Sequence, residues 1–447
     1  MPRPFPRLLF WPVLLLGAAL FAQQGDWTVL PNAPVTSRHN DVWFISPDEG
    51  WVVNGNGEIH HTGDGGNTWT LQFQKLDAHF RSVGFLNDSN GWAGNVGAGE
   101  FGTTDPVPLY HTADGGINWD PFTTFTGPTP AGICGMNVVD DSTIVAVGRV
   151  RGPAFFVRTT DGGATWTSRD MSAHAAGLID VKFFHPDTGF AVGLTNSDHS
   201  QSSGVVLYTE DGGQTWVPRY TSPRTGEWCW KLTFPTRQVG YASLQRNSNT
   251  PIYFLKTLDG GRTWASKQFR ATYYFVQGLG FVDELNGWIG GNSSEPVYET
   301  TDGGETWQSA GFGTRVNRLR FLGDTLGYAV GQTVYKYTRT VTGVGEAGNR
   351  GTGEPETFVL AQNYPNPFNP TTRIEFGLDR AEWVTLAVYN VRGGRIATLV
   401  DGPRAAGRYP VEWNGTDEAG GPVASGIYFY RMTAGDQVRT RKMMLLK

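Results

Sequence analysis

One eight-residue phrase, Thr-x-Asp-Gly-Gly-x-Thr-Trp, occurs six times in this chain of 447 residues and constrains its fold more than any other feature. Five copies fit the phrase fully, and the second has Asn118 in place of the second Thr. Successive Asp positions lie 43 to 50 residues apart, and these aspartates are Asp64, Asp114, Asp161, Asp211, Asp259 and Asp302. A period of that length indicates an array in which one supersecondary unit is repeated.

The phrase has the composition of a tight turn between two strands. An Asp carboxylate can accept hydrogen bonds from the backbone N–H groups that follow it, and two glycines readily adopt the positive φ of a strand reversal. The Trp opens the next strand, where its apolar ring can pack against a neighbouring unit. Because every unit needs the same turn, we interpret the six aspartates as structural rather than catalytic or metal-binding.

A second phrase precedes each copy and completes the repeat. It is an alternating strand, a polar turn and a Gly-aromatic strand, as in Val42-Trp43-Phe44 followed by Gly50-Trp51-Val52. It occurs seven times, with a degenerate copy over residues 136–148 and a last copy, residues 319–330, that no Asp phrase follows. Each full unit is therefore predicted to form four short strands.

The last unit lacks a fourth strand, and the N-terminal segment Asp26–Leu30 has the form of the missing one. If this segment pairs with the last unit, the ring closes and leaves no long sheet edge unpaired. The sequence thus predicts an all-β fold with a seven-bladed β-propeller over residues 26–338, in a domain that we assign to residues 23–338. A six-bladed ring is the alternative.

These phrases also carry a family resemblance. The six copies resemble the Asp-box of sialidase-like propellers, whose pattern is Ser/Thr-x-Asp-x-Gly-x-Thr-Trp. With its seven units, the region further resembles the seven-bladed family named for photosystem II stability and assembly factors. The resemblance implies the propeller fold, but not photosystem assembly, because nothing else in the chain indicates a photosynthetic membrane.

The first 22 residues have the form of a signal peptide. Arg3 and Arg7 precede the apolar run Leu8–Ala22, which is short for a membrane span and ends in small residues. We expect residues 1–22 to be removed and the mature chain to be exported without a transmembrane segment; retention as an N-terminal anchor is the alternative. The net charge of −5 gives no basic surface for nucleic acid.

The two cysteines, Cys134 and Cys229, fall in different units, so we expect free thiols rather than a disulfide.

The C-terminal part of the chain departs from the repeat. Residues 339–356 have no apolar period, which predicts a flexible linker. Six alternating segments in residues 357–447 then predict a small immunoglobulin-like β-sandwich. They are residues 373–378, 384–389, 395–400, 409–413, 426–432 and 438–446.

Five phrases of this domain, in the same order, resemble the type A sorting domain of type IX secretion. They are Asn-Tyr-Pro-Asn-Pro-Phe-Asn-Pro at 363–370, Val-Tyr-Asn-Val-Arg-Gly at 388–393, Val-Glu-Trp-Asn-Gly-Thr-Asp at 411–417, Ala-Ser-Gly-Ile-Tyr-Phe-Tyr-Arg at 424–431 and Lys-Met-Met-Leu-Leu-Lys at 442–447. The resemblance implies the type IX secretion machinery as a partner and a secreted or outer-surface location. It leaves open whether the domain is cleaved and the protein attached to lipopolysaccharide. An immunoglobulin-like adhesion module is the alternative interpretation.

Ligand binding is predicted on the face opposite to the Asp phrases, where three loops, residues 95–106, 194–204 and 244–251, are long and aperiodic. Charged and aromatic side chains at the entries between blades are the candidates. They are Arg38, His39, His79, Arg81, Trp228, Trp230, Arg315 and Arg318. Such a mixture suits a glycan, peptide or protein ligand, with an ordinary solvated rim as the alternative.

No catalytic pattern is complete. The chain lacks the arginine, Tyr and Glu set of a sialidase, zinc-ligand spacing and a Gly-x-Ser-x-Gly elbow. We therefore expect no catalytic residue, metal or cofactor, and predict a monomeric, exported binding or scaffold protein. The alternative is a secreted glycoside hydrolase with two carboxylates across a cleft, for which Glu100, Asp105 and Asp198 are the candidates.

Overall fold

The computed structural model describes residues 25–339 except 248, 249 and 324, and residues 358–446 except 364, 367, 379–381, 391–393, 406, 419, 435 and 436. The chain separates into two compact units, residues 1–342 and 343–447. All regular structure in the described residues is β-strand, which confirms the predicted all-β class. The predicted signal peptide, residues 1–22, and residues 340–356 of the predicted linker lie outside the described residues.

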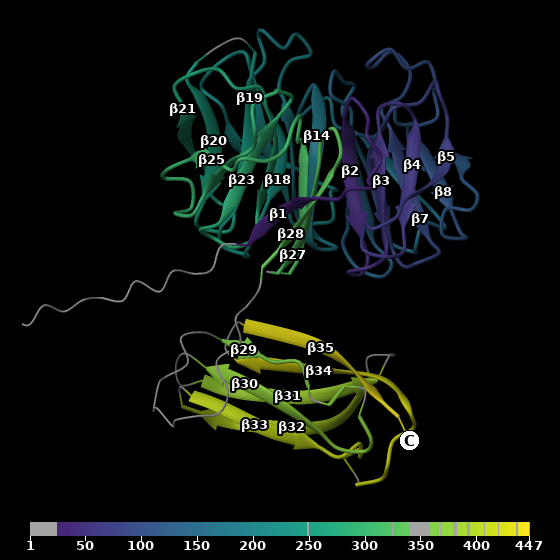
Figure 1. Cartoon of the computed structure of the whole chain (residues 1–447), viewed down its shortest axis with the longest axis vertical. Coiled ribbons are helices and arrows are strands. Elements are labelled where there is room, and N and C mark those ends of the chain that lie inside the picture. The colour runs from purple at the N-terminus through teal and green to yellow at the C-terminus, as the bar shows by residue number, and fades with distance from the viewer. Residues whose placement is uncertain are drawn as a thin grey trace, which may run out of the picture. The chain divides into compact units, whose positions relative to one another are not determined.

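The described part of the first unit contains seven four-stranded antiparallel sheets, and six of these use four consecutive strands (Figure 1). The first three such sheets are β2 (His39–Phe44), β3 (Gly50–Asn54), β4 (Glu58–Thr62) and β5 (Thr70–Gln74); β6 (Phe80–Phe85), β7 (Gly91–Asn95), β8 (Leu109–Thr112) and β9 (Asp120–Phe122); and β10 (Gly135–Val138), β11 (Ile144–Gly148), β12 (Phe155–Thr159) and β13 (Thr167–Asp170). The next three are β14 (Gly177–His185), β15 (Thr188–Leu194), β16 (Gly204–Thr209) and β17 (Val217–Thr221); β18 (Glu227–Thr233), β19 (Gly240–Arg246), β20 (Ile252–Thr257) and β21 (Ala265–Arg270); and β22 (Val276–Phe281), β23 (Gly287–Gly291), β24 (Tyr298–Thr300) and β25 (Gln308–Ser309).

The seventh sheet joins the two ends of the repeat array. Its strands, in spatial order, are β1 (Asp26–Val29), β28 (Val334–Thr338), β27 (Leu326–Val330) and β26 (Arg318–Leu322). β1 runs antiparallel to β28, with Trp27 opposite Tyr337, so the predicted pairing of the N-terminal segment is confirmed. The Trp27 ring also stacks on Phe312, with ring centroids 4.8 Å apart, and so ties the strand to the preceding sheet.

The seven sheets form a ring around their first strands. β2, β6, β10, β14, β18, β22 and β26 each contact the next, and β26 contacts β2. Apolar side chains fill the space between neighbouring sheets, as where Trp51 stacks on Phe85 at 3.5 Å and Tyr241 on Phe281 at 3.6 Å. This is the architecture of a β-propeller.

The Gly-aromatic phrase has a packing reason. A Cβ added at Gly91 would lie 2.3 Å from the ring of Phe85, the last residue of the preceding strand. Gly50, Gly189, Gly240, Gly287 and Gly327 face Phe44, Phe183, Phe234, Phe281 and Phe321 in the same way. A glycine at this position therefore lets the aromatic ring of the first strand cover the second strand.

The Asp phrases are the turns between third and fourth strands. In the first copy, Asp64 Oδ1 accepts hydrogen bonds from the Thr62 hydroxyl at 2.8 Å and from the Thr68 N–H at 2.8 Å. The following glycines, Gly65 and Gly66, have φ of 71° and 92°. The other five copies repeat these bonds, with Asn118 replacing Thr in the second.

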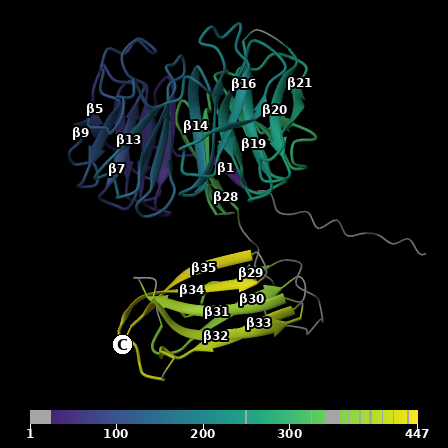
Figure 2. The same cartoon turned by 180° about the vertical axis from the view of Figure 1, so that it is seen from behind.

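The second unit contains two antiparallel sheets (Figure 2). One has the order β29 (Val359–Leu360), β30 (Thr372–Leu378) and β33 (Gly407–Trp413), and the other β32 (Arg395–Arg404), β31 (Glu382–Asn390), β34 (Gly426–Ala434) and β35 (Gln437–Leu445). One apolar cluster joins the two sheets through residues such as Phe376, Trp413 and Tyr430. The six strands predicted for this region are confirmed, and the arrangement is a β-sandwich.

Candidate functional site

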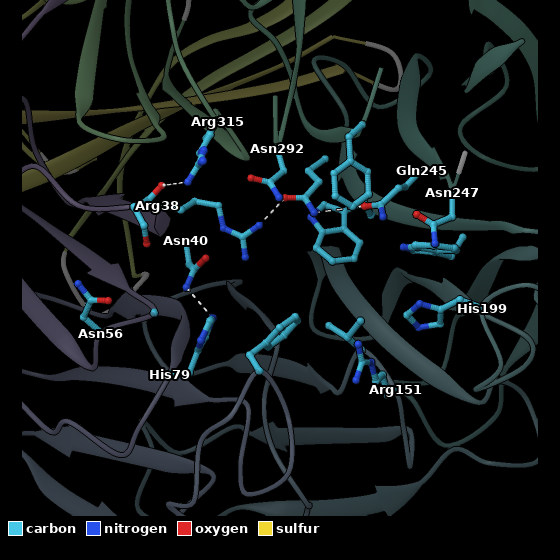
Figure 3. A pocket seen from close by; sticks show the side chains of 18 residues that line it. Arg38, Asn40, Asn56, His79, Arg151, His199, Gln245, Asn247, Asn292 and Arg315 are labelled. Carbon is cyan, nitrogen blue, oxygen red and sulfur yellow. Dashed lines mark hydrogen bonds between the residues drawn. The ribbon is translucent and has the colours of Figure 1, made fainter. Parts of the chain in front are cut away.

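The first unit contains a cavity of about 450 Å³ whose walls come from all seven sheets (Figure 3). Its lining residues precede the first strands, lie in the first halves of these strands, or lie at and beyond the ends of the second strands. The Asp turns lie at the other end of the sheets, because the N–H of Gly65 donates to the carbonyl of Asp48 in the turn between β2 and β3. The cavity is thus on the face where the sequence predicted a ligand.

The cavity is cationic. Arg38, Arg151 and Arg315 line it together with His79 and His199, and none of its lining residues is Asp or Glu. Burial and the neighbouring positive charges lower the pKa of Arg38 to about 9. The same two causes hold the pKa of His79 well below its usual value. The cations therefore repel one another, and this repulsion would be relieved by an anion.

Hydrogen bonds fix the polar side chains on one side of the cavity. Arg38 donates from Nη1 to Oε1 of Gln277 at 2.7 Å. The Asn40 amide nitrogen is 3.1 Å from Nε2 of His79, as Figure 3 shows. Since the amide nitrogen can only donate, His79 must accept at Nε2 and is held as the neutral ring.

Aromatic rings make up much of the remaining wall. Phe101 stacks on His79 with ring centroids 4.9 Å apart, and His199 packs against Trp228 at 4.4 Å. The ring N–H groups of Trp228 and Trp230 are buried and have no hydrogen-bond partner within the described protein. The wall thus offers flat apolar surface to a ligand.

Two lining residues also have uncommon backbone conformations. Phe101 has φ of 48° and Arg315 has φ of 54°, and they are the two non-glycine residues with positive φ in the described part of the chain. A bulky side chain in this region carries a local energetic cost, and such residues cluster at functional sites.

Five of the eight residues predicted from sequence lie in the cavity wall: Arg38, His79, Trp228, Trp230 and Arg315. His39, Arg81 and Arg318 do not, which corrects the sequence prediction that they face a ligand directly. His39 is fully buried, its Nε2 lies 2.9 Å from the Pro34 carbonyl, and burial lowers its pKa to about 4.

Arg318 is instead part of a buried ion-pair network. Its Nη1 and Nη2 donate to the two carboxylate oxygens of Asp180 at 3.0 Å and 2.8 Å. Its Nε lies 3.0 Å from Oδ1 of Asp41, which also accepts from Arg320. Arg318 is therefore a structural cation.

The three carboxylates considered for hydrolysis are not brought together at the cavity. Glu100 is buried and accepts from the backbone N–H of Arg151 at 2.8 Å. Asp105 is buried and accepts from the Tyr110 hydroxyl at 2.8 Å. Asp198 accepts from the N–H and hydroxyl of Ser200 in an exposed turn. None of them lines the cavity, so they do not form a carboxylate pair across it.

Several lining residues were not singled out from sequence, although most lie in or near the loops that were. They include Phe101, Arg151, His199, Gln245, Asn247 and Asn292. Figure 3 shows Gln245, Asn247 and His199 across the cavity from Asn40 and His79.

In the described residues, no group of three or more His, Cys, Asp or Glu could hold a metal ion. No helix in the described ranges is long and apolar enough to cross a membrane. Cys134 and Cys229 are both buried free thiols.

Two parts of the chain match known protein families in sequence. Residues 21–137 match the family described as photosynthesis system II assembly factor YCF48, and residues 365–437 match the FlgD Ig-like domain. The propeller is YCF48-like in part of its sequence. No curated protein matches the chain in sequence.

Solved structures share the fold at low sequence identity. YCF48 bound to D1 peptide is 20% identical with a TM-score of 0.52, covering 72% of this chain and 97% of that one. YCF48 from Cyanidioschyzon merolae is 18% identical with a TM-score of 0.54, covering 70% and 98%. PorZ, a surface component of the type-IX secretion system of Porphyromonas gingivalis, is 13% identical with a TM-score of 0.50, covering 94% and 61%. At these identities the likeness concerns the fold alone.

Proposed function

We propose that this chain is an exported binding protein whose propeller, with one blade per sheet and hence seven blades, holds an acidic peptide in the cationic cavity. The main support is that the cavity wall contains three arginines and no carboxylate. Guanidinium groups pair with carboxylates in a bidentate geometry, and the aromatic rings offer surface to apolar side chains of the same peptide. One structural neighbour is a YCF48 bound to a peptide, which supports a peptide as the ligand class.

The size of the cavity supports the same class. Its volume of about 450 Å³ lies within the range of sites that enclose a small ligand, so it suits a peptide end or a few side chains. The terminal carboxylate of a peptide would bring one negative charge to the mutually repelling Arg38, Arg151 and Arg315.

The binding proposal can be tested with the purified full chain on a peptide array whose members carry either free or amidated C-termini. We expect retention of peptides with free carboxylates, and loss of that retention in an Arg151→Gln/Arg315→Gln double variant. Both side chains are exposed, so the variant should remain folded. Arg169→Gln, an exposed arginine of the same unit outside the cavity, is the matched control. Equal retention of peptides with free and with amidated C-termini would contradict the proposal. Turnover of chromogenic glycosides at the cavity would also contradict it.

We further propose a domain order of signal peptide (1–22), propeller (23–338), linker (339–356) and type IX sorting domain (357–447). The support is the set of C-terminal phrases, the immunoglobulin-like match and the fold shared with a type-IX surface component. Deleting residues 357–447 should leave the propeller in the periplasm of the source organism. Unchanged surface display after that deletion would contradict the sorting role.

A further inference from the structure

Two buried cationic side chains next to the cavity have donors without a protein partner. Arg81 and Lys231 are both 0% exposed. Nε and Nη2 of Arg81 and Nζ of Lys231 have no hydrogen-bond partner within the described protein. Within the described residues, the Arg81 side chain donates one long hydrogen bond, 3.4 Å from Nη1 to Oδ1 of Asn40.

Both residues lie on first strands, β6 and β18, which line the inside of the ring. The Arg81 guanidinium, on β6, lies 5.1 Å from the ring centroid of Trp230 and 5.7 Å from that of Phe101. Lys231 follows Trp230 on β18, and the charge of Arg81 acts on it. Because both aromatic rings line the cavity, the Arg81 guanidinium lies directly behind its wall, and Lys231 is the chain neighbour of the lining residue Trp230.

Nearby carboxylates do not neutralise this pair. Asp180 uses both oxygens on Arg318, and one of them also accepts from the N–H of Leu232. Asp41 is paired with Arg320 and Arg318. Five buried or half-buried cations thus surround two carboxylates: Arg81, Lys182, Lys231, Arg318 and Arg320.

A buried charge without a counter-charge is energetically unfavourable. Burial, and next the charge of Arg318, lower the pKa of Lys231 to about 7. Lys231 can therefore lose its proton, but a guanidinium keeps its charge at any ordinary pH. Buried charges are stable when they are paired, so Arg81 requires a counter-charge close to its free donors.

We propose that Arg81 and Lys231 form a buried binding site for a small monovalent anion of the halide class, behind the ligand cavity. The anion would accept from Nε and Nη2 of Arg81 and from Nζ of Lys231. This site does not depend on the proposed peptide ligand, since its donors are buried and an inorganic ion suffices.

Binding at this site is coupled to protonation of Lys231. The charged or titratable groups that act on Lys231 are Arg81 on β6, Cys134 before β10, Asp180 on β14 and Arg318 on β26, and Lys231 in turn acts on Asp41 on β2. The anion favours the charged lysine, so it should bind more weakly as the pH rises above about 7.

The test uses the full chain with halides as probes. Crystals soaked in bromide should show an anomalous peak between Arg81 and Lys231. In solution at pH 6.5, chloride should raise the Tm by about 3 °C over an equal concentration of gluconate, which is too large to enter. The rise should shrink at pH 9 and disappear in Lys231→Met.

Lys182→Met is the matched control. Burial, and next the charge of Arg320, lower the pKa of Lys182 to about 8, but it is not among the charges acting on Lys231. This variant should keep the chloride effect. Should Lys231→Met fail to fold, the bromide peak in the unaltered chain decides the question. The proposal would be overturned if bromide were found only at the exposed arginines of the cavity, or if the Tm were equal in chloride and gluconate. Either result would mean that water satisfies the free donors.

Discussion

Replacing Arg318 by Met should destabilise the propeller more than any change at its surface. Arg318 is 5% exposed and bonds both oxygens of Asp180, which is 1% exposed, while Asp41 at 0% exposure lies on its other side. Met retains most of the aliphatic stem but removes the charge. Asp180 is then left buried without its main partner, which is the costly way to break an ion pair.

Removing one partner of a buried ion pair costs about 3–5 kcal/mol. With a urea slope of about 3 kcal/mol per M, the midpoint of unfolding should fall by about 1 M or more. Tryptophan fluorescence of the full chain reports mainly on the propeller, since residues 343–447 contain only Trp383 and Trp413. Lys267→Met is the control, because it breaks an exposed pair with Glu305 and should lower the urea midpoint only slightly.

The pH dependence gives a second readout. Although burial alone would raise the pKa of Asp180, Arg318 and Lys231 lower it to about 2. The stabilisation from this carboxylate is therefore present above its unfolded pKa, near 4, and is lost only as the pH falls toward 2. Without Arg318, burial should raise the pKa of Asp180 above its value in the unfolded chain. The Arg318→Met variant should therefore become more stable as the pH falls from 7 to 5. A midpoint shift no larger than that of Lys267→Met, together with no gain at pH 5, would refute this reasoning.

Two further predictions concern ring closure and the Asp turns. A chain that begins at Pro31 lacks β1 and leaves β28 as an open edge, so its urea midpoint should fall and its transition broaden; unfolding at the same concentration as the full chain would contradict closure. Asp302→Asn replaces the carboxylate oxygen that accepts from the Thr306 hydroxyl by an NH2 donor and should cost about 2 kcal/mol in urea unfolding, against no change for Glu299→Gln. Despite partial burial, hydrogen bonds led by that from Thr306 lower the pKa of Asp302 to about 2, so its contribution should persist to pH 4 and vanish toward pH 2.

Features set by local chemistry could be predicted from the sequence. The turn at Asp64 needs the carboxylate and two glycines within a few residues, and the order of four strands follows from its recurrence. The pairing of β1 with β28 joins residues far apart in the sequence, but the repeat predicts it. The last unit lacks a fourth strand, and the N-terminal segment before the first unit is an extra strand.

Side-chain direction at the cavity could not be predicted so well. Register irregularities interrupt the strands where candidate residues lie, between His39 and Asp41, between Phe80 and Ser82, and between Cys229 and Leu232. A bulge changes which face a side chain takes, so alternation no longer tells whether Arg81 points to the cavity or behind its wall.

Other positions depend on partners far away in the chain. The place of Arg318 is decided by Asp180, 138 residues distant in sequence. Phe101 and His199 lie in loops that were predicted to form the binding face, but loops have no period from which to infer direction. The face was therefore predictable, while the identity of its lining residues was only partly so.

The affinity difference between one acidic peptide and its amidated form tests the central claim most directly. Isothermal titration of the full chain with a peptide retained on the array would compare the two forms at one salt concentration. We predict that the free acid binds at least about tenfold more tightly, which is the effect of one charge-assisted hydrogen bond. The difference should disappear in Arg151→Gln/Arg315→Gln but remain in Arg169→Gln. Equal affinity of both forms for the unaltered chain, or a difference that survives the double substitution, would contradict a carboxylate-binding cavity.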